Sequence, residues 1–236
     1  MKKTLPIRHS ASTGLTLIEL LVLVAIIVVL VGFLIPPCGS RIGNKGRRTD
    51  SLSNAKQVAV ALRMYAEDHG GNFPSTRIDG KPFAHGDFSN QAFEQVMPKY
   101  CTNKKLFRNN ASAWCKEPAT DVGETDIYRI KRGQNDWIYV TDLKNESDPN
   151  WPLIATATAS ATNLTYTNSK TAKGGVWEGK AAIIAYVDGS ARPLTDGDMD
   201  LTDKTKTFPK RQDTGTNIFI GTSDWLGTGR LILAPE

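Results

Sequence analysis

The hydrophobic residues of this chain begin with one long, almost uninterrupted run. Residues 15–35 are nearly all apolar, and Glu19 is the one charged side chain among them. An α-helix rises 1.5 Å per residue, so this run reaches roughly 30 Å, the thickness of the hydrocarbon core of a bilayer. We therefore predict a transmembrane helix over residues 15–35.

A second helix is predicted over residues 50–69, where the pattern becomes amphipathic. Apolar residues recur there at the spacing of one helix face, and charged residues take the opposite side. The apolar face consists of Leu52, Ala55, Ala59, Leu62 and Ala66. Thr49 or Asp50 would serve as the N-cap, and Gly70 and Gly71 would end the helix.

Residues 36–48 separate the two helices and disfavour helical structure. They contain Pro36, Pro37 and three glycines. Proline removes a backbone donor, and glycine weakens a helix. We expect a linker or kink over residues 36–48, and the pattern leaves open whether one helix continues through it.

After the second helix the pattern changes to short strands. Runs rich in β-branched, aromatic or apolar residues predict strands over 136–141, 152–157, 181–187, 190–194, 217–220 and 230–233. Asp188 and Gly189 mark a tight turn between two of them. A short helix is expected from Asn90 to Met97. Residues 155–175, dense in Ala, Thr, Ser and Asn, are expected to form an exposed loop.

These elements together predict an α+β fold. The apolar face of the helix over residues 50–69 needs a partner, and the short strands supply a small antiparallel sheet to cover it. The expected architecture is a long N-terminal helix, first transmembrane and then amphipathic, packed on that sheet.

The net charge does not indicate a nucleic-acid partner. The chain carries 29 basic and 24 acidic residues, a formal charge of +5, but Lys2, Lys3 and Arg8 precede the apolar run. Without those three, 26 of the 29 basic residues remain against 24 acidic ones. So small an excess does not suggest a surface that binds phosphate backbones.

The residues around Glu19 form a recognisable motif. An acid inside an apolar helix costs on the order of 3 kcal/mol near a bilayer centre, so such a residue usually serves a purpose. A basic leader ending in Gly14, followed by Leu15–Glu19, resembles the processing motif of type IV prepilins and of the pseudopilins of type II secretion. Leu15 departs from that motif, in which phenylalanine is usual.

The resemblance implies how the chain is processed and divided. A membrane peptidase would cut between Gly14 and Leu15 and methylate the new amine of Leu15. Glu19 would orient incoming subunits by pairing with the N-terminal amine of a neighbour. The implied segments are a leader (1–14), a transmembrane helix segment (15–35), a linker (36–48) and an α+β domain outside the cytoplasm (49–236).

Two further parts of the chain resemble a pseudopilin-like group known from planctomycete and verrucomicrobial genomes. The first consists of two pieces inside the amphipathic helix and one directly after it, and the second is the late strand with its Asp-Gly turn. These pieces are residues 53–57, 62–68, 71–74 and 182–191. Residues 75–135 carry no such resemblance, so the likeness extends to only part of the chain.

The function implied by the resemblance is structural and not enzymatic. The chain would be a subunit of a type II secretion pseudopilus or a type IV pilus-like filament. It would be a single-pass protein of the bacterial inner membrane, with a pilin-like fold and a periplasmic C-terminal domain. Its partners would be prepilin peptidase, other pilin or pseudopilin subunits, inner-membrane lipids and the secretion or pilus assembly machinery.

The N-terminal run also has three alternative interpretations. A secretory signal peptide has a shorter apolar stretch and a small-residue cleavage site, which does not follow this run. Cys38 follows it as in a lipoprotein signal, but Pro36 and Pro37 fit that signal poorly. A plain membrane anchor is the third alternative. The rival function is a membrane-anchored periplasmic binding module or enzyme that uses the helix only as a tether.

Few residues suggest chemistry. Cys101 and Cys115 are candidates for a disulfide in a domain outside the cytoplasm, with two unlinked thiols as the alternative. His69 and His85 occur without a metalloprotease, nucleophile-elbow or phosphate-loop motif. We therefore expect no enzymatic activity.

Two remaining patterns hint at ligands but fit common structural roles better. Asp196, Asp198 and Asp200 alternate as at the start of a calcium loop, whose ligands are oxygens. Leu201 stands where such a loop needs glycine and Thr207 where it needs an acid, so we expect a polar turn and no cofactor, with calcium as the alternative. Five scattered tryptophans suit a β-rich core better than a carbohydrate-binding surface: Trp114, Trp137, Trp151, Trp177 and Trp225.

Overall fold

The computed structural model describes residues 16–34, 41–116, 128–160, 162–203, 206–222 and 224–236. The predicted cleavage junction between Gly14 and Leu15 lies outside the described residues, as does Cys38. The chain divides into two compact units, Met1–Ile42 and Gly43–Glu236, and each is described by itself.

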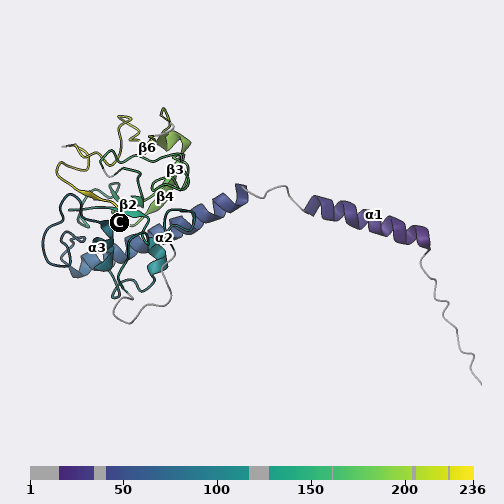
Figure 1. Cartoon of the computed structure of the whole chain (residues 1–236), viewed down its shortest axis with the longest axis horizontal. Coiled ribbons are helices and arrows are strands. Elements are labelled where there is room, and N and C mark those ends of the chain that lie inside the picture. Colours follow the sequence, from purple (N-terminus) through teal and green to yellow (C-terminus); the bar gives the residue numbers. More distant parts are fainter. Residues whose placement is uncertain (1–15, 35–40, 117–127, 161, 204–205, 223) are drawn as a thin grey trace, which may run out of the picture. The chain divides into compact units, whose positions relative to one another are not determined.

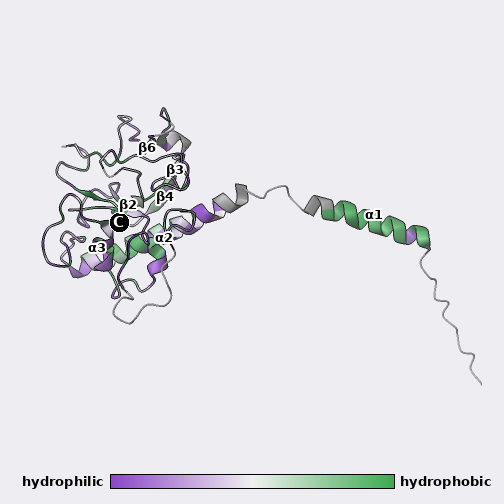
Figure 2. Cartoon of the chain, in the orientation of Figure 1, coloured by the Kyte–Doolittle hydropathy of each residue, from purple (hydrophilic) through white to green (hydrophobic). Residues whose placement is uncertain are grey.

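The first unit contains helix α1 (Leu17–Leu34), whose coloured part is hydrophobic along nearly its whole length in Figure 2. Its 18 residues extend about 27 Å along the helix axis. Within the described residues, no helix combines the length and the apolar character needed to cross a membrane. The predictions of a transmembrane helix over 15–35, of a single-pass pseudopilin and of an inner-membrane location are therefore wrong.

Helix α2 (Arg41–Asp68) begins well before the predicted start at Thr49 or Asp50. The hydroxyl of Thr49 donates to the carbonyl of Lys45, four residues earlier, at 3.2 Å. A side chain can reach that carbonyl only from inside a continuous helix. Thr49 therefore continues α2 instead of capping it, and residues 41–48 of the predicted linker are helical.

The second unit is built around a five-stranded antiparallel sheet with the strand order β4-β3-β2-β1-β7. Figure 1 labels β2, β3 and β4 of this sheet. Its strands are β1 (Trp137–Val140), β2 (Pro152–Thr156), β3 (Ala181–Tyr186), β4 (Ala191–Thr195) and β7 (Ile232–Leu233). A separate ribbon pairs β5 (Met199–Asp200) with β6 (Phe208–Pro209). All predicted strands are present except the one over 217–220, which is a turn.

The sheet is buried on both faces. Successive residues of a strand point to opposite faces, so Trp137 and Tyr139 of β1 enter one core while Ile138 between them enters the other. The same division separates Ile183 from Ile184 in β3. This explains why β1 and β3 have nearly continuous apolar sequences instead of alternating ones.

Different parts of the chain cover the two faces of the sheet and complete the two cores. The apolar face of α2 and the short helix α3 (Ser89–Glu94) contribute to the first core. Leu164 and Tyr166 contribute to the second, together with Ile218 and Phe219 near the C-terminus. Leu164 and Tyr166 are 6% and 1% exposed, so the loop predicted to be exposed over residues 155–175 is partly buried.

The predicted fold class is wrong. The chain does not fold as one long N-terminal helix, first transmembrane and then amphipathic, packed on a small sheet, because no described helix is long and apolar enough to cross a membrane and the sheet has five antiparallel strands. Apart from short 3₁₀ turns, the described helices are α1, α2 and α3, and α1 belongs to the other compact unit. The architecture of the second unit is a five-stranded antiparallel sheet between α2 and α3 on one face and loops on the other.

The β3–β4 hairpin turns at Asp188 and Gly189, as predicted. The N–H of Ser190 donates to Asp188 Oδ1 at 2.7 Å, and the N–H of Gly189 donates to the Tyr186 carbonyl at 2.9 Å. Gly189 has a φ of 82°, in the left-handed region that side chains disfavour. A Cβ atom there would also lie 3.0 Å from Arg63 Cδ of α2.

Gly189→Ala should destabilise the second unit by about 1 kcal/mol, because alanine disfavours a positive φ and crowds Arg63. Thermal unfolding of the purified protein would measure the loss. Gly197→Ala is a matched control, since Gly197 lacks a positive φ and a Cβ atom there would meet nothing within 4 Å. Equal melting temperatures for the two variants would contradict the prediction.

Candidate functional site

Glu19 lies in the first turn of α1 and caps the helix. The N–H and the hydroxyl of Thr16 both donate to Glu19 Oε2 at 2.9 Å, and the Glu19 N–H donates to Thr16 Oγ1 at 3.3 Å. This reciprocal arrangement is a capping box, which satisfies donors that a helix start leaves free. The bonds from Thr16 hold the pKa of Glu19 below its ordinary value, so the carboxylate is charged at neutral pH.

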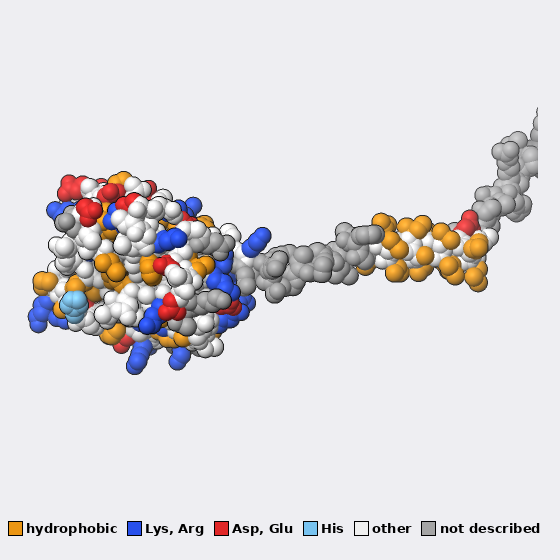
Figure 3. Space-filling view, turned by 90° about the horizontal axis from the view of Figure 1, so that it is seen from above, with side chains coloured by type: hydrophobic (Ala, Val, Ile, Leu, Met, Phe, Trp, Pro, Cys, Tyr) orange, Lys and Arg blue, Asp and Glu red, His pale blue; other side chains and the backbone are white. Residues whose placement is uncertain are grey.

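The rest of α1 presents an apolar surface. Its large side chains from Leu17 to Val31 are between 46% and 82% exposed. Figure 3 shows them as a continuous hydrophobic band, and Glu19 is the acidic residue in the first turn. A contiguous apolar surface of this kind marks a site of interaction.

Cys101 and Cys115, the candidates for a disulfide, are both free thiols in the structure and both buried. Burial raises the pKa of Cys101. Burial, assisted by the charge of Asp136, raises the pKa of Cys115 to about 12. Both thiols are therefore protonated at neutral pH, and neither is a reactive nucleophile.

Asp136 is a buried acid that no sequence pattern singles out. It directly precedes β1, is 1% exposed, and its Oδ2 has no hydrogen-bond partner among the described residues. Burial raises the pKa of Asp136 to about 8, while a hydrogen bond from Ser112 and the charges of Lys173 and Arg108 act in the opposite direction. Because the carboxyl group of Asp136 is buried, the difference between its pKa in the folded and in the unfolded chain makes the free energy of unfolding depend on pH.

The alternating aspartates span a turn and the strand after it, since Asp196 and Asp198 lie in a 3₁₀ turn and Asp200 ends β5. Asp198 ends the 3₁₀ turn Asp196–Asp198, and its Oδ1 accepts a hydrogen bond from Gln212 Nε2 at 3.4 Å. Asp200 accepts from the N–H of Thr202 at 2.8 Å. Across the described part of the chain, no group of three or more His, Cys, Asp or Glu side chains is placed to hold a metal ion.

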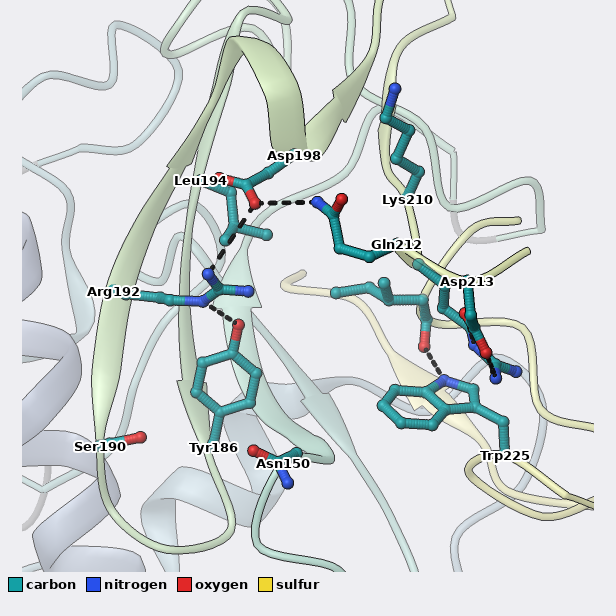
Figure 4. Close-up of a pocket in the computed structure, with 12 residues that line it drawn as sticks. Asn150, Tyr186, Ser190, Arg192, Leu194, Asp198, Lys210, Gln212, Asp213 and Trp225 are labelled. Carbon is teal, nitrogen blue, oxygen red and sulfur yellow. Dashed lines mark hydrogen bonds and ion pairs between the residues drawn. The ribbon is translucent and has the colours of Figure 1, made fainter. Parts of the chain in front are cut away.

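A cavity of about 420 Å³ lies between the β3–β4 hairpin and the C-terminal segment (Figure 4). Its lining comes from three separate parts of the chain: Asn150 before β2, the hairpin with its following turn (186–198), and residues 210–225. The volume is within the range of small-molecule sites, roughly 300–1,000 Å³.

Two aromatic rings, Tyr186 and Trp225, line this cavity on different sides (Figure 4). Arg192 Nε donates to Tyr186 Oη at 2.9 Å, and Trp225 Nε1 donates to the carbonyl of Ile218 at 3.0 Å. The Arg192 guanidinium lies 5.8 Å from the centre of the Tyr186 ring, and that of Arg211 lies 4.7 Å from the Trp225 ring. Both rings are therefore held in position by the protein itself.

The charges around the cavity nearly balance. Arg192 Nη1 lies 3.8 Å from Asp198 Oδ1, and Arg211 Nε donates to Asp213 Oδ1 at 3.0 Å. Lys210 also lines the cavity, so the lining carries three cationic side chains and two carboxylates. The site thus combines fixed aromatic rings with closely spaced donors and acceptors.

The sequence pattern predicts Trp225 as a core residue and does not place it beside Tyr186. No local pattern connects residues 150, 186 and 225, which meet only in the folded chain. No protein-family model, curated protein or solved structure matches the sequence or the fold.

Proposed function

We propose that the chain is a structural, non-enzymatic subunit of a type IV pilus-like or type II secretion filament and assembles through α1. The observation that carries the proposal is the exposed surface of α1, which is apolar on every side and has one carboxylate in its first turn. Covering such a surface is favourable by about 25 cal/mol for each Å² of apolar area removed from water.

The partner proposed for α1 is the same helix in further copies of the chain. A helix that is apolar all round is stabilised by burial among others of its kind. Cleavage between Gly14 and Leu15 by prepilin peptidase, followed by methylation of Leu15, would place a cationic amine just before Thr16. That amine is the natural partner for a carboxylate in apolar surroundings.

The geometry of Glu19 is compatible with this second partner. Both hydrogen bonds from Thr16 end on Oε2, while Oε1 receives none from the described residues. Oε1 is therefore open to the amine of a neighbouring subunit without loss of the capping box. Other pilin subunits and the secretion or pilus assembly machinery complete the proposed set of partners.

Glu19→Gln should reduce filament formation about tenfold, corresponding to roughly 1.4 kcal/mol per contact, and leave cleavage after Gly14 nearly unchanged. Glutamine keeps the size and one acceptor oxygen for Thr16, but removes the charge that attracts the amine. Cross-linking between subunits and electron microscopy of sheared filaments, in cells that carry a prepilin peptidase, would measure assembly. Intact mass would show whether the mature chain starts at a methylated Leu15.

Glu146→Gln is the control, because Glu146 is an exposed acid outside α1, paired only loosely with Lys144 at 3.8 Å. It should assemble like the parent chain. Full assembly of the Glu19→Gln chain, or a mass that retains residues 1–14 or shows a lipid on Cys38, would remove the support for a filament subunit.

A binding module is the second candidate function, and the cavity beside Tyr186 and Trp225 favours it. A binding module tolerates the loss of the Glu19 charge, whereas a filament subunit does not. The Glu19→Gln experiment therefore separates the two functions.

A further inference from the structure

We propose that the cavity between the β3–β4 hairpin and the C-terminal segment binds a short saccharide. The inference rests on the lining of the cavity and does not depend on assembly through α1. Three properties carry it: two fixed aromatic rings, a mixture of hydrogen-bond donors and acceptors, and a nearly balanced charge.

The two rings provide flat apolar surfaces. The C–H faces of a sugar ring are apolar while its rim carries hydroxyl groups, so a sugar packs against an aromatic ring and is bound by polar groups at its edge. Tyr186 and Trp225 are each fixed by a hydrogen bond at the polar end of the side chain. Their orientation is settled before binding, which lowers the entropic cost of holding a ligand.

The polar groups suit hydroxyls, which both donate and accept hydrogen bonds. The Asp198 carboxylate only accepts, Arg192 only donates, and the amides of Gln212 and Asn150 do both. Figure 4 shows Arg192, Asp198 and Gln212 together near one end of the cavity, and Asn150 near the other. The hydroxyl groups of a saccharide can therefore form hydrogen bonds at both ends of the cavity.

The charges argue against a phosphate-rich ligand such as a nucleotide. Such a ligand needs several cationic groups directed at it. Here Arg211 is engaged by Asp213, and Arg192 lies between Tyr186 and Asp198. Lys210 leaves one positive charge in excess over the carboxylates, so the cavity suits a neutral saccharide or one with a single acidic group.

Calorimetric titration of the full chain, kept in solution with a detergent that has no sugar headgroup, tests the proposal. The probes are cellohexaose, chitohexaose and hexagalacturonic acid, which are neutral, acetamido and acidic saccharides, with adenosine monophosphate as the comparison. At least one saccharide should bind with a dissociation constant of about 1 mM or tighter, and adenosine monophosphate should not.

Two variants tie the binding to this cavity. Trp225→Ala should weaken it roughly tenfold, and Gln212→Ala, at an exposed position where folding is not at stake, should weaken it about threefold. Trp151→Ala is the matched control, because Trp151 is also partly buried against the first core and also has a guanidinium, that of Arg230, 4.7 Å from its ring. It should bind like the parent chain.

Three results would overturn the proposal. They are the absence of heat with all three saccharides, binding of adenosine monophosphate in their place, and saccharide binding that survives both Trp225→Ala and Gln212→Ala. None of these results bears on filament formation, which the Glu19→Gln variant tests separately.

Discussion

Raising the pH from 5 to 8 should destabilise the folded second unit by about 3 kcal/mol through Asp136 alone. Burial raises the pKa of Asp136 to about 8 in the folded chain, whereas an aspartate in the unfolded chain titrates near 4. The folded state therefore retains a proton that the unfolded state releases. Its stability is greatest below pH 4, falls as the pH rises toward 8, and is level above that value.

Asp136→Asn should remove most of this slope. The amide is nearly isosteric with the protonated carboxyl group and can keep the contact with Ser112, so stability at pH 5 should change by about 1 kcal/mol or less. At pH 8 the variant should be more stable than the parent chain. Urea unfolding at several pH values between 4 and 9 would measure both curves.

Asp50→Asn is the control for this comparison. Asp50 lies on the exposed side of α2, so its replacement should leave the pH dependence of the parent chain intact. Parallel curves for the parent chain and Asp136→Asn would show that the buried carboxyl group does not take up the proton.

Trp137→Ala should cost about 3–5 kcal/mol, the largest loss expected from a single substitution here. Trp137 is fully buried in the first core, and its indole N–H donates to the carbonyl of Leu106 at 3.0 Å. Removing the ring leaves a large cavity and an unsatisfied carbonyl. Since small domains are stable by roughly 5–15 kcal/mol, the variant should be close to unfolding at room temperature.

Denaturant unfolding followed by circular dichroism would measure the loss of stability. The Trp137→Phe variant would separate the contribution of the ring volume from that of the hydrogen bond to Leu106. Phenylalanine restores much of the volume but not the donor to Leu106, so its loss should be intermediate. Trp151→Ala, at the edge of the same core, should cost clearly less. A loss for Trp137→Ala no larger than for Trp151→Ala would contradict the structure of this core.

Most strands could be predicted because their sequence and their environment agree. β3 reads as one apolar run, and both faces of it are buried, so its sequence has no competing local preference. The same holds for β1 and β2. The turn at Gly189 could be predicted as well, since only a residue without a side chain takes its φ of 82° easily.

The failed predictions each have a local physical cause. In the segment 217–220, the side chain of Asn217 accepts the N–H of Phe219 at 3.0 Å, which folds the chain into a turn where its apolar residues suggested a strand. At the start of α2, the hydroxyl of Thr49 bonds back to Lys45 inside the helix. The same residue types serve as caps elsewhere, so the sequence alone does not distinguish the two roles.

The candidate sites differ in how far the sequence reveals them. Glu19 stands out in the sequence because it is a charge in an apolar run, and Thr16 stands three residues before it, which is the spacing of a capping box. Asp136 resembles any polar residue at the start of a strand, since its burial depends on neighbours distant in sequence. The cavity beside Trp225 joins parts of the chain more than 70 residues apart, from 150 to 225, and has no signal in any one of them.

The two edges of the five-stranded sheet bear on how copies of this chain can crowd together. A filament would raise the local concentration of the sheets, and open strand edges in such surroundings tend to fuse into cross-β aggregates. In β4, the exposed charge of Arg192 and the missing N–H of Pro193 both disfavour pairing with a strand of another copy. At the other edge β7 has only two residues, and the carbonyl of Ala234 that follows it is already taken by the N–H of Ser89 at 3.0 Å. Both edges of the sheet therefore discourage pairing with the sheet of another copy.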